Sequence, residues 1–325
     1  MLQSTVIATA MCGAAFAIAP HAAETAAGYP ARPITIVVPF GAGAANDLLA
    51  RSIADVLRER LGPAVVENRP GANTSIGAEA VKRSPPDGHT LLIGGNNMVI
   101  TKAMVPDLRW DPIADFEPVA LTNTLPFFLV VNPEALPVRN AAEMVAEIRK
   151  RPGALSYVSP GNGSSHNLAM ELFKLETGID VVHVPYKAMA QGVLDMVSGR
   201  THLTITGYPA VATQVKAGRL KVLAAAGSRR SAIVPDAPTL AESGFPSYAF
   251  DSWQGLFAPK GTPRAIVERL NQTINAGLAT PALRARLQDQ GLEPMAATPE
   301  QFADRVATDS AKWRKVIAAT GVRPD

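Results

Sequence analysis

The stretch ITIVVPFGAGAANDLLARSIADVL, residues 34–57, predicts a strand, a glycine-containing loop and a helix in direct succession. Its first five residues are β-branched and lead into Pro39. Gly41 and Gly43 lie among small residues, and apolar side chains then recur at helical spacing from Leu48 to Leu57. Because the first amides of a helix have no partner within the helix, this unit is suited to hold an anion.

A second stretch, LSYVSPGNGSSHNLAMELF at residues 155–173, has the same order about 120 residues later. Ser164 or Ser165 can cap the helix that follows the loop. Ser165 and His166 are adjacent, which leaves a serine hydrolase as an alternative, but the G-x-S-x-G elbow is absent. Two such loops in separate halves of the chain predict a small anion held between two lobes.

The order of apolar runs predicts an α/β protein with mostly parallel sheets. Expected strands are residues 34–38, 64–67, 90–93, 127–131, 155–159, 181–184, 202–206 and 222–225, with helices at 47–61, 76–82, 141–149, 166–176, 191–198 and 210–217. Thr-Pro pairs at 262–263, 280–281 and 298–299 each predict an N-cap before proline at the first helical position. Three C-terminal helices are therefore expected, and the tryptophans are expected in the core.

Composition excludes several classes of protein. The 325-residue chain is 47% hydrophobic and 18% charged, with a net charge of +3 and no block of like charge, so no nucleic-acid partner is expected. Cys12 is the single cysteine, and the histidines lack metal-ligand spacing. No metal, disulfide or cofactor is therefore expected.

Residues 1–27 have the pattern of a secretory signal peptide, with an apolar run at 6–18 followed by small residues. They lack the basic residues that usually begin such a signal. An exported chain whose only cysteine lies within the signal is typical of the bacterial periplasm.

A dinucleotide-binding oxidoreductase is a further alternative. The Gly41–Gly43 loop lacks the third glycine of G-x-G-x-x-G, although Glu67 lies near the expected acidic position.

A third strand-to-helix loop contains Tyr186 and Lys187, and each can donate to a carboxylate. The competing interpretation is that Tyr186 packs and Lys187 is solvated.

Together, these motifs resemble the Bug (TctC-like) family, the extracytoplasmic solute receptors of tripartite tricarboxylate transporters. The motifs are YPARPI at 29–34, VPF at 38–40, VENRPGA at 66–72, PDG at 86–88, PGNGSS at 160–165, HVPYK at 183–187, AGRL at 217–220, APKGTP at 258–263 and TPEQF at 298–302. The resemblance covers nearly all of residues 28–325.

The resemblance implies a type II periplasmic-binding-protein fold. Lobe 1 would comprise residues 28–123 and 250–325 and lobe 2 residues 124–249, with a small carboxylate between them. It also implies two integral membrane subunits as partners, and we expect a monomer. The expected ligand-binding residues are Phe40, Gly41, Gly43, Asn46, Asp47, Ser159, Asn162, Gly163, Ser164, Ser165, His166, Tyr186, Lys187 and Thr206.

The chain departs from the family at several of these positions. In the first loop, Ala44 stands where the family has a glycine, and Asn46 stands where it has Thr or Ser. Elsewhere, Met189 and Thr206 can favour a ligand less charged than a dicarboxylate. An ionised Asp47 would repel a carboxylate. We therefore expect it to accept amide hydrogen bonds that fix loop 40–46, or to hold a water; the alternative is a simple N-cap.

Overall fold

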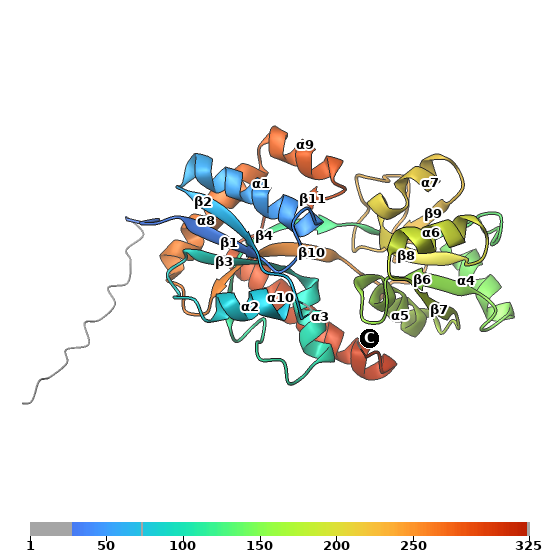
Figure 1. The fold of residues 1–325 in the computed structure, drawn as a ribbon. Helices are drawn as coiled ribbons and strands as arrows, with labels where there is room; N and C mark the ends of the chain where they lie inside the picture. The colour runs from blue at the N-terminus through green and yellow to red at the C-terminus, as the bar shows by residue number, and fades with distance from the viewer. Residues whose placement is uncertain (1–27, 73, 324–325) are drawn as a thin grey trace, which may run out of the picture.

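The computed structural model describes residues 28–72 and 74–323 (Figure 1). The expected signal peptide at residues 1–27 lies outside the described residues. The chain forms two sheets, each with its own helices, as the α/β prediction requires.

The first sheet has six strands in the order β11–β4–β10–β3–β1–β2. Its strands are β1 (Ile34–Val38), β2 (Ala64–Asn68), β3 (Thr90–Gly95), β4 (Phe116–Leu125), β10 (Ser252–Pro259) and β11 (Glu293–Pro294). Strand β1 pairs in parallel with β2 and β3, whereas β10 is antiparallel to both β3 and β4.

The second sheet has five strands in the order β7–β6–β8–β5–β9. Its strands are β5 (Phe127–Val131), β6 (Ser156–Ser159), β7 (Val182–Pro185), β8 (Leu203–Gly207) and β9 (Lys221–Ala225). Strand β6 is parallel to β7 and β8, and β5 is antiparallel to β8 and β9.

The expectation of mostly parallel sheets is wrong, because both sheets are mixed. The physical reason is that the chain passes between the sheets. Strand β4 leaves the first sheet and continues through Pro126 into β5 of the second, and β10 returns to the first (Figure 1). Both linking strands pair antiparallel to their neighbours, which adds antiparallel pairs inside each sheet.

The helices fall into the two groups seen in Figure 1. Beside the first sheet lie α1 (Ala45–Arg60), α2 (Ser75–Lys82), α3 (Asn96–Met104), α8 (Arg264–Leu278), α9 (Pro281–Asp289) and α10 (Pro299–Thr320). Beside the second lie α4 (Ala141–Lys150), α5 (Ser165–Thr177), α6 (Met189–Val197), the 3₁₀ turn η1 (Tyr208–Ala210) and α7 (Ala212–Lys216).

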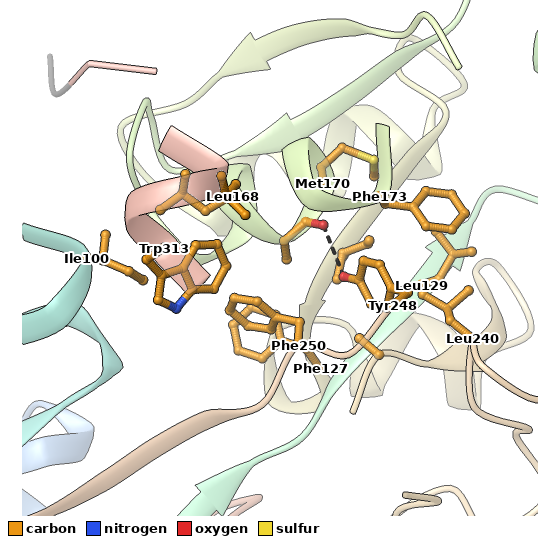
Figure 2. Packing of buried hydrophobic residues seen from close by; sticks show 14 of the residues in the cluster. Ile100, Phe127, Leu129, Leu168, Met170, Phe173, Leu240, Tyr248, Phe250 and Trp313 are labelled. Atoms are coloured by element: carbon orange, nitrogen blue, oxygen red, sulfur yellow. Dashed lines mark hydrogen bonds between the residues drawn. The ribbon is translucent and has the colours of Figure 1, made fainter. Parts of the chain in front are cut away.

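One continuous apolar cluster joins the two halves. It contains Val37 and Leu92 from the first sheet together with Leu129 and Leu203 from the second. Figure 2 shows Trp313 of α10 beside Phe250, and their ring centroids lie 5.6 Å apart. The C-terminal helix therefore packs at the junction of the two halves.

All three tryptophans, at positions 110, 253 and 313, are buried, as expected. Around Trp313, the rings of Phe127 and Phe250 lie 5.0 Å apart, and Tyr248 donates to the carbonyl of Ala169 at 3.0 Å (Figure 2). The aromatic residues of the linking segments thus belong to the core.

The C-terminal helices confirm two of the three predicted caps. Thr298 and Thr280 both occupy the N-cap position before a proline, and Thr298 completes a capping box with Gln301. The side chain of Thr280 does not cap its helix, because its hydroxyl donates to the Gly277 carbonyl at 2.7 Å. The prediction for Thr262 is wrong: Pro263 is the N-cap of α8, and the Thr262 hydroxyl donates to the Pro259 carbonyl instead.

Two other helix predictions need correction. The expected helix at 210–217 is divided into η1 and the short α7. Helix α3 was not expected, because it follows Gly94 and begins with two asparagines, a composition typical of turns. It packs against α10, so tertiary contact decides its conformation.

Candidate functional site

A cavity of about 560 Å³ lies where the two halves face each other. One wall comes from the first half and the other from the loop that precedes α5. Its lining residues are Pro39, Phe40, Gly41, Pro70, Gly71, Thr74, Asn97, Ile100, Thr101, Met104, Pro160, Asn162, Gly163, Ser164 and Ser165. This volume is within the range of about 300–1,000 Å³ typical of small-molecule sites.

The loop between β1 and α1 is held in shape by Asp47. Its carboxylate is 1% exposed and accepts the Gly43 amide at 2.9 Å, the Arg51 Nε at 2.9 Å and the Asn68 Nδ2 at 2.9 Å. Gly43 has φ +82°, which favours glycine over other residues. The expectation that Asp47 accepts amide hydrogen bonds and fixes this loop is confirmed.

Asp47 is not an N-cap residue, so that alternative is wrong. Helix α1 begins at Ala45, and Ala44 is the N-cap residue without a capping side chain. Asp47 is the third residue of the helix and reaches back to the loop.

The loop between β6 and α5 has an equivalent conformation. The Gly163 amide donates to Asn167 Oδ1 at 3.0 Å, and Gly163 has φ +72°. Ser164 is the N-cap residue, as one of the two predicted alternatives proposed, and its hydroxyl oxygen accepts the Asn167 amide at 3.2 Å. Ser165 begins α5 and lines the cavity.

Among the described residues that line the cavity, none is Lys, Arg, Asp or Glu. Helix α5, of 13 residues, begins at this cavity with Ser165, so its positive dipole end supplies a favourable potential for an anion. The lining from the first loop ends at Gly41, and the 16-residue helix α1 begins farther along the chain at Ala45. Asp47 does not line the cavity, and its charge is paired with Arg51.

The electrostatics of Asp47 agree with this pairing. The pKa of Asp47 is lowered to about 2, mainly by the hydrogen bond from Arg51. Burial acts in the opposite direction and raises this pKa, whereas the hydrogen bonds from the Gly43 amide and Asn68 lower it further. Asp47 is therefore ionised at neutral pH. Its negative charge is compensated by the Arg51 guanidinium and by the Gly43 and Asn68 donors.

His166 is half-buried, and its ring packs against the core. Its ring centroid is 5.0 Å from that of Phe127, and burial lowers the pKa of His166 to about 4. The structure describes both Ser165 and His166 and shows no hydrogen bond between them. The arrangement required for a serine nucleophile with a histidine base is not formed.

Two other predicted site residues are engaged in supporting contacts. Asn46 accepts a hydrogen bond from Gln254 of β10, and Gln254 in turn accepts from Asn123 of β4 at 3.0 Å. Ser159 is fully buried at the end of β6, where its hydroxyl bonds Gly161 at 3.1 Å and the His183 Nε2 at 2.6 Å. Asn46 thus connects the first loop to the linking strands.

Three further predicted residues lie outside the cavity lining, in addition to Gly43, Asn46, Asp47, Ser159 and His166. The Tyr186 hydroxyl donates to Asp195 at 2.6 Å, and burial together with this bond raises the pKa of Tyr186 to about 12. Lys187 is exposed, and Thr206 is fully buried in β8. Met189 also lies outside the lining.

The sequence analysis missed the wall formed by α3. Asn97, Ile100, Thr101 and Met104 lie on one face of this helix and line the cavity. Their spacing of i, i+3, i+4 and i+7 is helical, so the signal was present once residues 96–104 are known to form a helix.

Residues 49–322 match the family model described as tripartite tricarboxylate transporter family receptor, TctC. The chain belongs to this family. It is 35% identical to Protein BugT of Bordetella pertussis over 308 residues, which cover 94% of this chain and 93% of BugT.

Two solved TctC-like structures carry ligands. An R. palustris protein solved with adipate is 37% identical to this chain and has a TM-score of 0.74. The match covers 91% of this chain and 100% of the R. palustris chain. MatC from Rhodopseudomonas palustris, solved with bound malate, is 30% identical to this chain and has a TM-score of 0.70. The match covers 89% of this chain and 100% of the MatC chain.

These similarities confirm the predicted TctC/Bug resemblance and the two-sheet periplasmic-binding-protein fold. The chain is a solute-binding receptor of a transporter family and not an enzyme, so the oxidoreductase and hydrolase alternatives do not apply.

Within residues 28–72 and 74–323, no helix is both long and apolar enough to cross a membrane. The same residues contain no acidic, histidine or cysteine cluster suited to a metal ion.

Proposed function

We propose that this TctC receptor captures a small carboxylate between the β1–α1 and β6–α5 loops. The observation that carries the proposal is the pair of equivalent loops at one cavity, each with a positive-φ glycine tied to the start of a helix. Relatives solved with adipate and malate support a carboxylate as the ligand class.

The carboxylate is held by backbone amides and neutral side chains. Phe40 and Gly41 supply one side, and Asn162 and Gly163 to Ser165 supply the other. Gly43, Asn46, Asp47, Ser159 and His166 shape these loops, and Tyr186, Lys187 and Thr206 approach the ligand only after closure. An anion bound without an opposing lysine or arginine relies on helix N-termini and hydroxyl groups, as in other binding proteins.

The proposed cellular role follows from the family and the N-terminal sequence. Residues 1–27 direct export to the periplasm and are then removed, and the mature chain acts there as a monomer. Residues 28–123 with 250–325 form one lobe and residues 124–249 the other. The loaded receptor delivers its carboxylate to the integral membrane subunits of a tripartite transporter.

Thermal unfolding with a panel of small carboxylates, and with NAD and a simple ester for comparison, tests the proposal. A carboxylate at 100 times its Kd should add about 2.7 kcal/mol to the free energy of unfolding. Calorimetry should then show that Ser165→Ala weakens binding by about 0.5–1.5 kcal/mol, or up to about 3 for a charged ligand. A shift with NAD alone, or unchanged affinity in Ser165→Ala, contradicts the proposal.

A further inference from the structure

A chain of three side chains supports the β6–α5 loop from the interior of the protein. The Tyr157 hydroxyl of β6 donates to Glu171 Oε1 of α5 at 2.8 Å, and it accepts Asn167 Nδ2 at 2.8 Å. Asn167 Oδ1 in turn accepts the amide of Gly163, which lines the cavity. Tyr157 is fully buried, and Asn167 is 2% exposed. The acceptor that fixes Gly163 is therefore itself held by Tyr157.

Glu171 sets the direction of this chain. Its Oε1 also accepts from Lys174 Nζ at 2.9 Å and acts only as an acceptor, so the Tyr157 hydroxyl donates its single hydrogen to Glu171. The Tyr157 oxygen can then only accept, which turns Nδ2 of Asn167 toward Tyr157 and Oδ1 toward Gly163. The reversed amide would bring two donors, Asn167 Nδ2 and the Gly163 N–H, against each other.

Further contacts hold the Tyr157 ring and its proton in place. The ring stacks on that of His183, with centroids 4.8 Å apart and planes at 18°. Burial and the neighbouring Glu171 raise the pKa of Tyr157 well above its usual value, so the hydroxyl keeps its proton at neutral pH. Tyr157 is thus a fixed donor to Glu171 and a fixed acceptor for Asn167.

The first loop achieves the same result without such an orienting residue. Asp47 accepts the Gly43 amide, and a carboxylate presents an acceptor on either side, with Arg51 four residues later as its cation. In the second loop, Glu171 occupies the position four residues after Asn167. An amide at 167 avoids a second negative charge beside Glu171, but it can accept on one side only.

We propose that Tyr157 and Glu171 are positioning residues of the carboxylate site, which orient the Asn167 amide so that Gly163 and the start of α5 keep their ligand-binding conformation. Neither is among the described residues that line the cavity. The inference rests on the proposed carboxylate-receptor function and assigns part of its affinity to side chains behind the loop.

Two measurements test the inference. Calorimetry gives the affinity for adipate and malate, the carboxylates of the solved relatives. Amide NMR of the ligand-free protein reports the hydrogen bond of Gly163. Tyr157→Phe removes only the hydroxyl. Tyr248→Phe is the matched control, because the Tyr248 hydroxyl is also buried and donates to α5, at the Ala169 carbonyl.

We expect Tyr157→Phe to weaken binding of the tighter of the two carboxylates by about fivefold to tenfold, as the loss of one hydrogen bond would do. The Gly163 amide proton should move upfield and exchange faster. Tyr248→Phe should leave the affinity within about twofold and the Gly163 signal in place. Glu171→Gln should displace the Gly163 signal in the same direction as Tyr157→Phe, because a glutamine amide can donate to Tyr157 and permits the reversed chain.

A rescue variant distinguishes orientation from packing. Adding Asn167→Asp and Glu171→Arg to Tyr157→Phe gives the second loop the chemistry of Asp47 and Arg51, which needs no orienting hydroxyl. This triple variant should restore the Gly163 signal and bring the affinity back to within about twofold of the wild type. A Gly163 signal that stays displaced, or an affinity that stays low after the signal is restored, overturns the inference.

The remaining outcomes separate this inference from the proposed function. Wild-type affinity and an unmoved Gly163 signal in Tyr157→Phe overturn the inference and leave the receptor function standing. Equal losses of affinity in Tyr157→Phe and Tyr248→Phe indicate a general loss of stability and overturn it as well. Absence of adipate and malate binding in the wild type counts against the receptor function, whereas the Gly163 signal still decides whether Tyr157 orients Asn167.

Discussion

Asp47 and Asn167 occupy the same position in two equivalent loops, 120 positions apart in the sequence. Each accepts the backbone amide of a glycine four residues earlier, at 2.9 Å for Gly43 and 3.0 Å for Gly163. One loop achieves this geometry with a carboxylate and the other with an uncharged amide. The charge of Asp47 is therefore not required for the loop conformation.

Substitutions at Asp47 should separate its geometric role from its charge. Asp47→Asn should retain carboxylate binding, since its Oδ1 can still accept the Gly43 amide, as Asn167 does for Gly163. Asp47→Ala should weaken binding by about tenfold or more and lower the free energy of unfolding by about 1–3 kcal/mol, because it leaves donors unpaired. Calorimetry and urea unfolding measure the two effects.

Equal affinity in the wild type and Asp47→Ala would show that the loop does not hold the ligand. Asn167→Ala provides the matched substitution in the second loop. It should weaken binding in the same direction if both loops contact one ligand.

The stability of the protein should depend on pH through Asp47. Its pKa is lowered from 3.8 to about 2 in the folded state, so its stabilising contribution is present above pH 4 and is lost as the pH falls toward 2. Because Arg51 is half exposed, we expect a contribution on the order of 1 kcal/mol. Urea unfolding between pH 4 and pH 2 should show that the wild type loses this free energy of unfolding and that Asp47→Asn does not. The same pH dependence of the free energy of unfolding in both proteins would contradict the assignment to Asp47.

A comparison of the two loops identifies a missing cap in the first. Ala44 and Ser164 have nearly the same backbone conformation, with φ/ψ of −67°/159° and −65°/155°, but only Ser164 caps its helix. Ala44→Ser should therefore raise the free energy of unfolding by about 0.5–1 kcal/mol. Ser164→Ala, the reciprocal control, should lower it by about 1 kcal/mol. No gain in Ala44→Ser alongside a loss in Ser164→Ala would refute the equivalence.

Ligand binding should close the two halves. The cavity has walls from both, and the covalent connections are β4 with Pro126 and the segment that leads into β10. Closure around a bound carboxylate requires these connections to bend. Small-angle scattering should give a smaller radius of gyration with a saturating carboxylate than with a compound from the panel that does not bind. Equal radii would argue against closure.

The sequence predicted local structure well where one segment forms a complete unit. Both strand–loop–helix units were predicted because β-branched runs, loop glycines and helical periodicity are local signals. Strand direction was not predictable, because an apolar run looks the same in a parallel or antiparallel pair. Helix α3 was missed because glycine and asparagine at its start are typical of turns, whereas its packing against α10 is a contact between distant segments.

Contacts between distant segments explain the remaining differences at the site. Asn46 was expected to bind ligand, yet it bonds Gln254 on a linking strand far along the sequence. Thr74 was not expected at the site, since it lines the cavity through the way in which α2 and α3 are placed by the fold. No local sequence pattern predicts the position of Asn46 beside Gln254 or that of Thr74 in the cavity wall.

The most direct test of the central claim is a titration of isotope-labelled protein with the tightest-binding carboxylate, followed by amide NMR. The account predicts the largest shifts at residues 40–44 and 161–166, with one dissociation constant for both loops. Shifts confined to one loop, or centred elsewhere, such as the surface depression at Pro137 and Arg151, would contradict it.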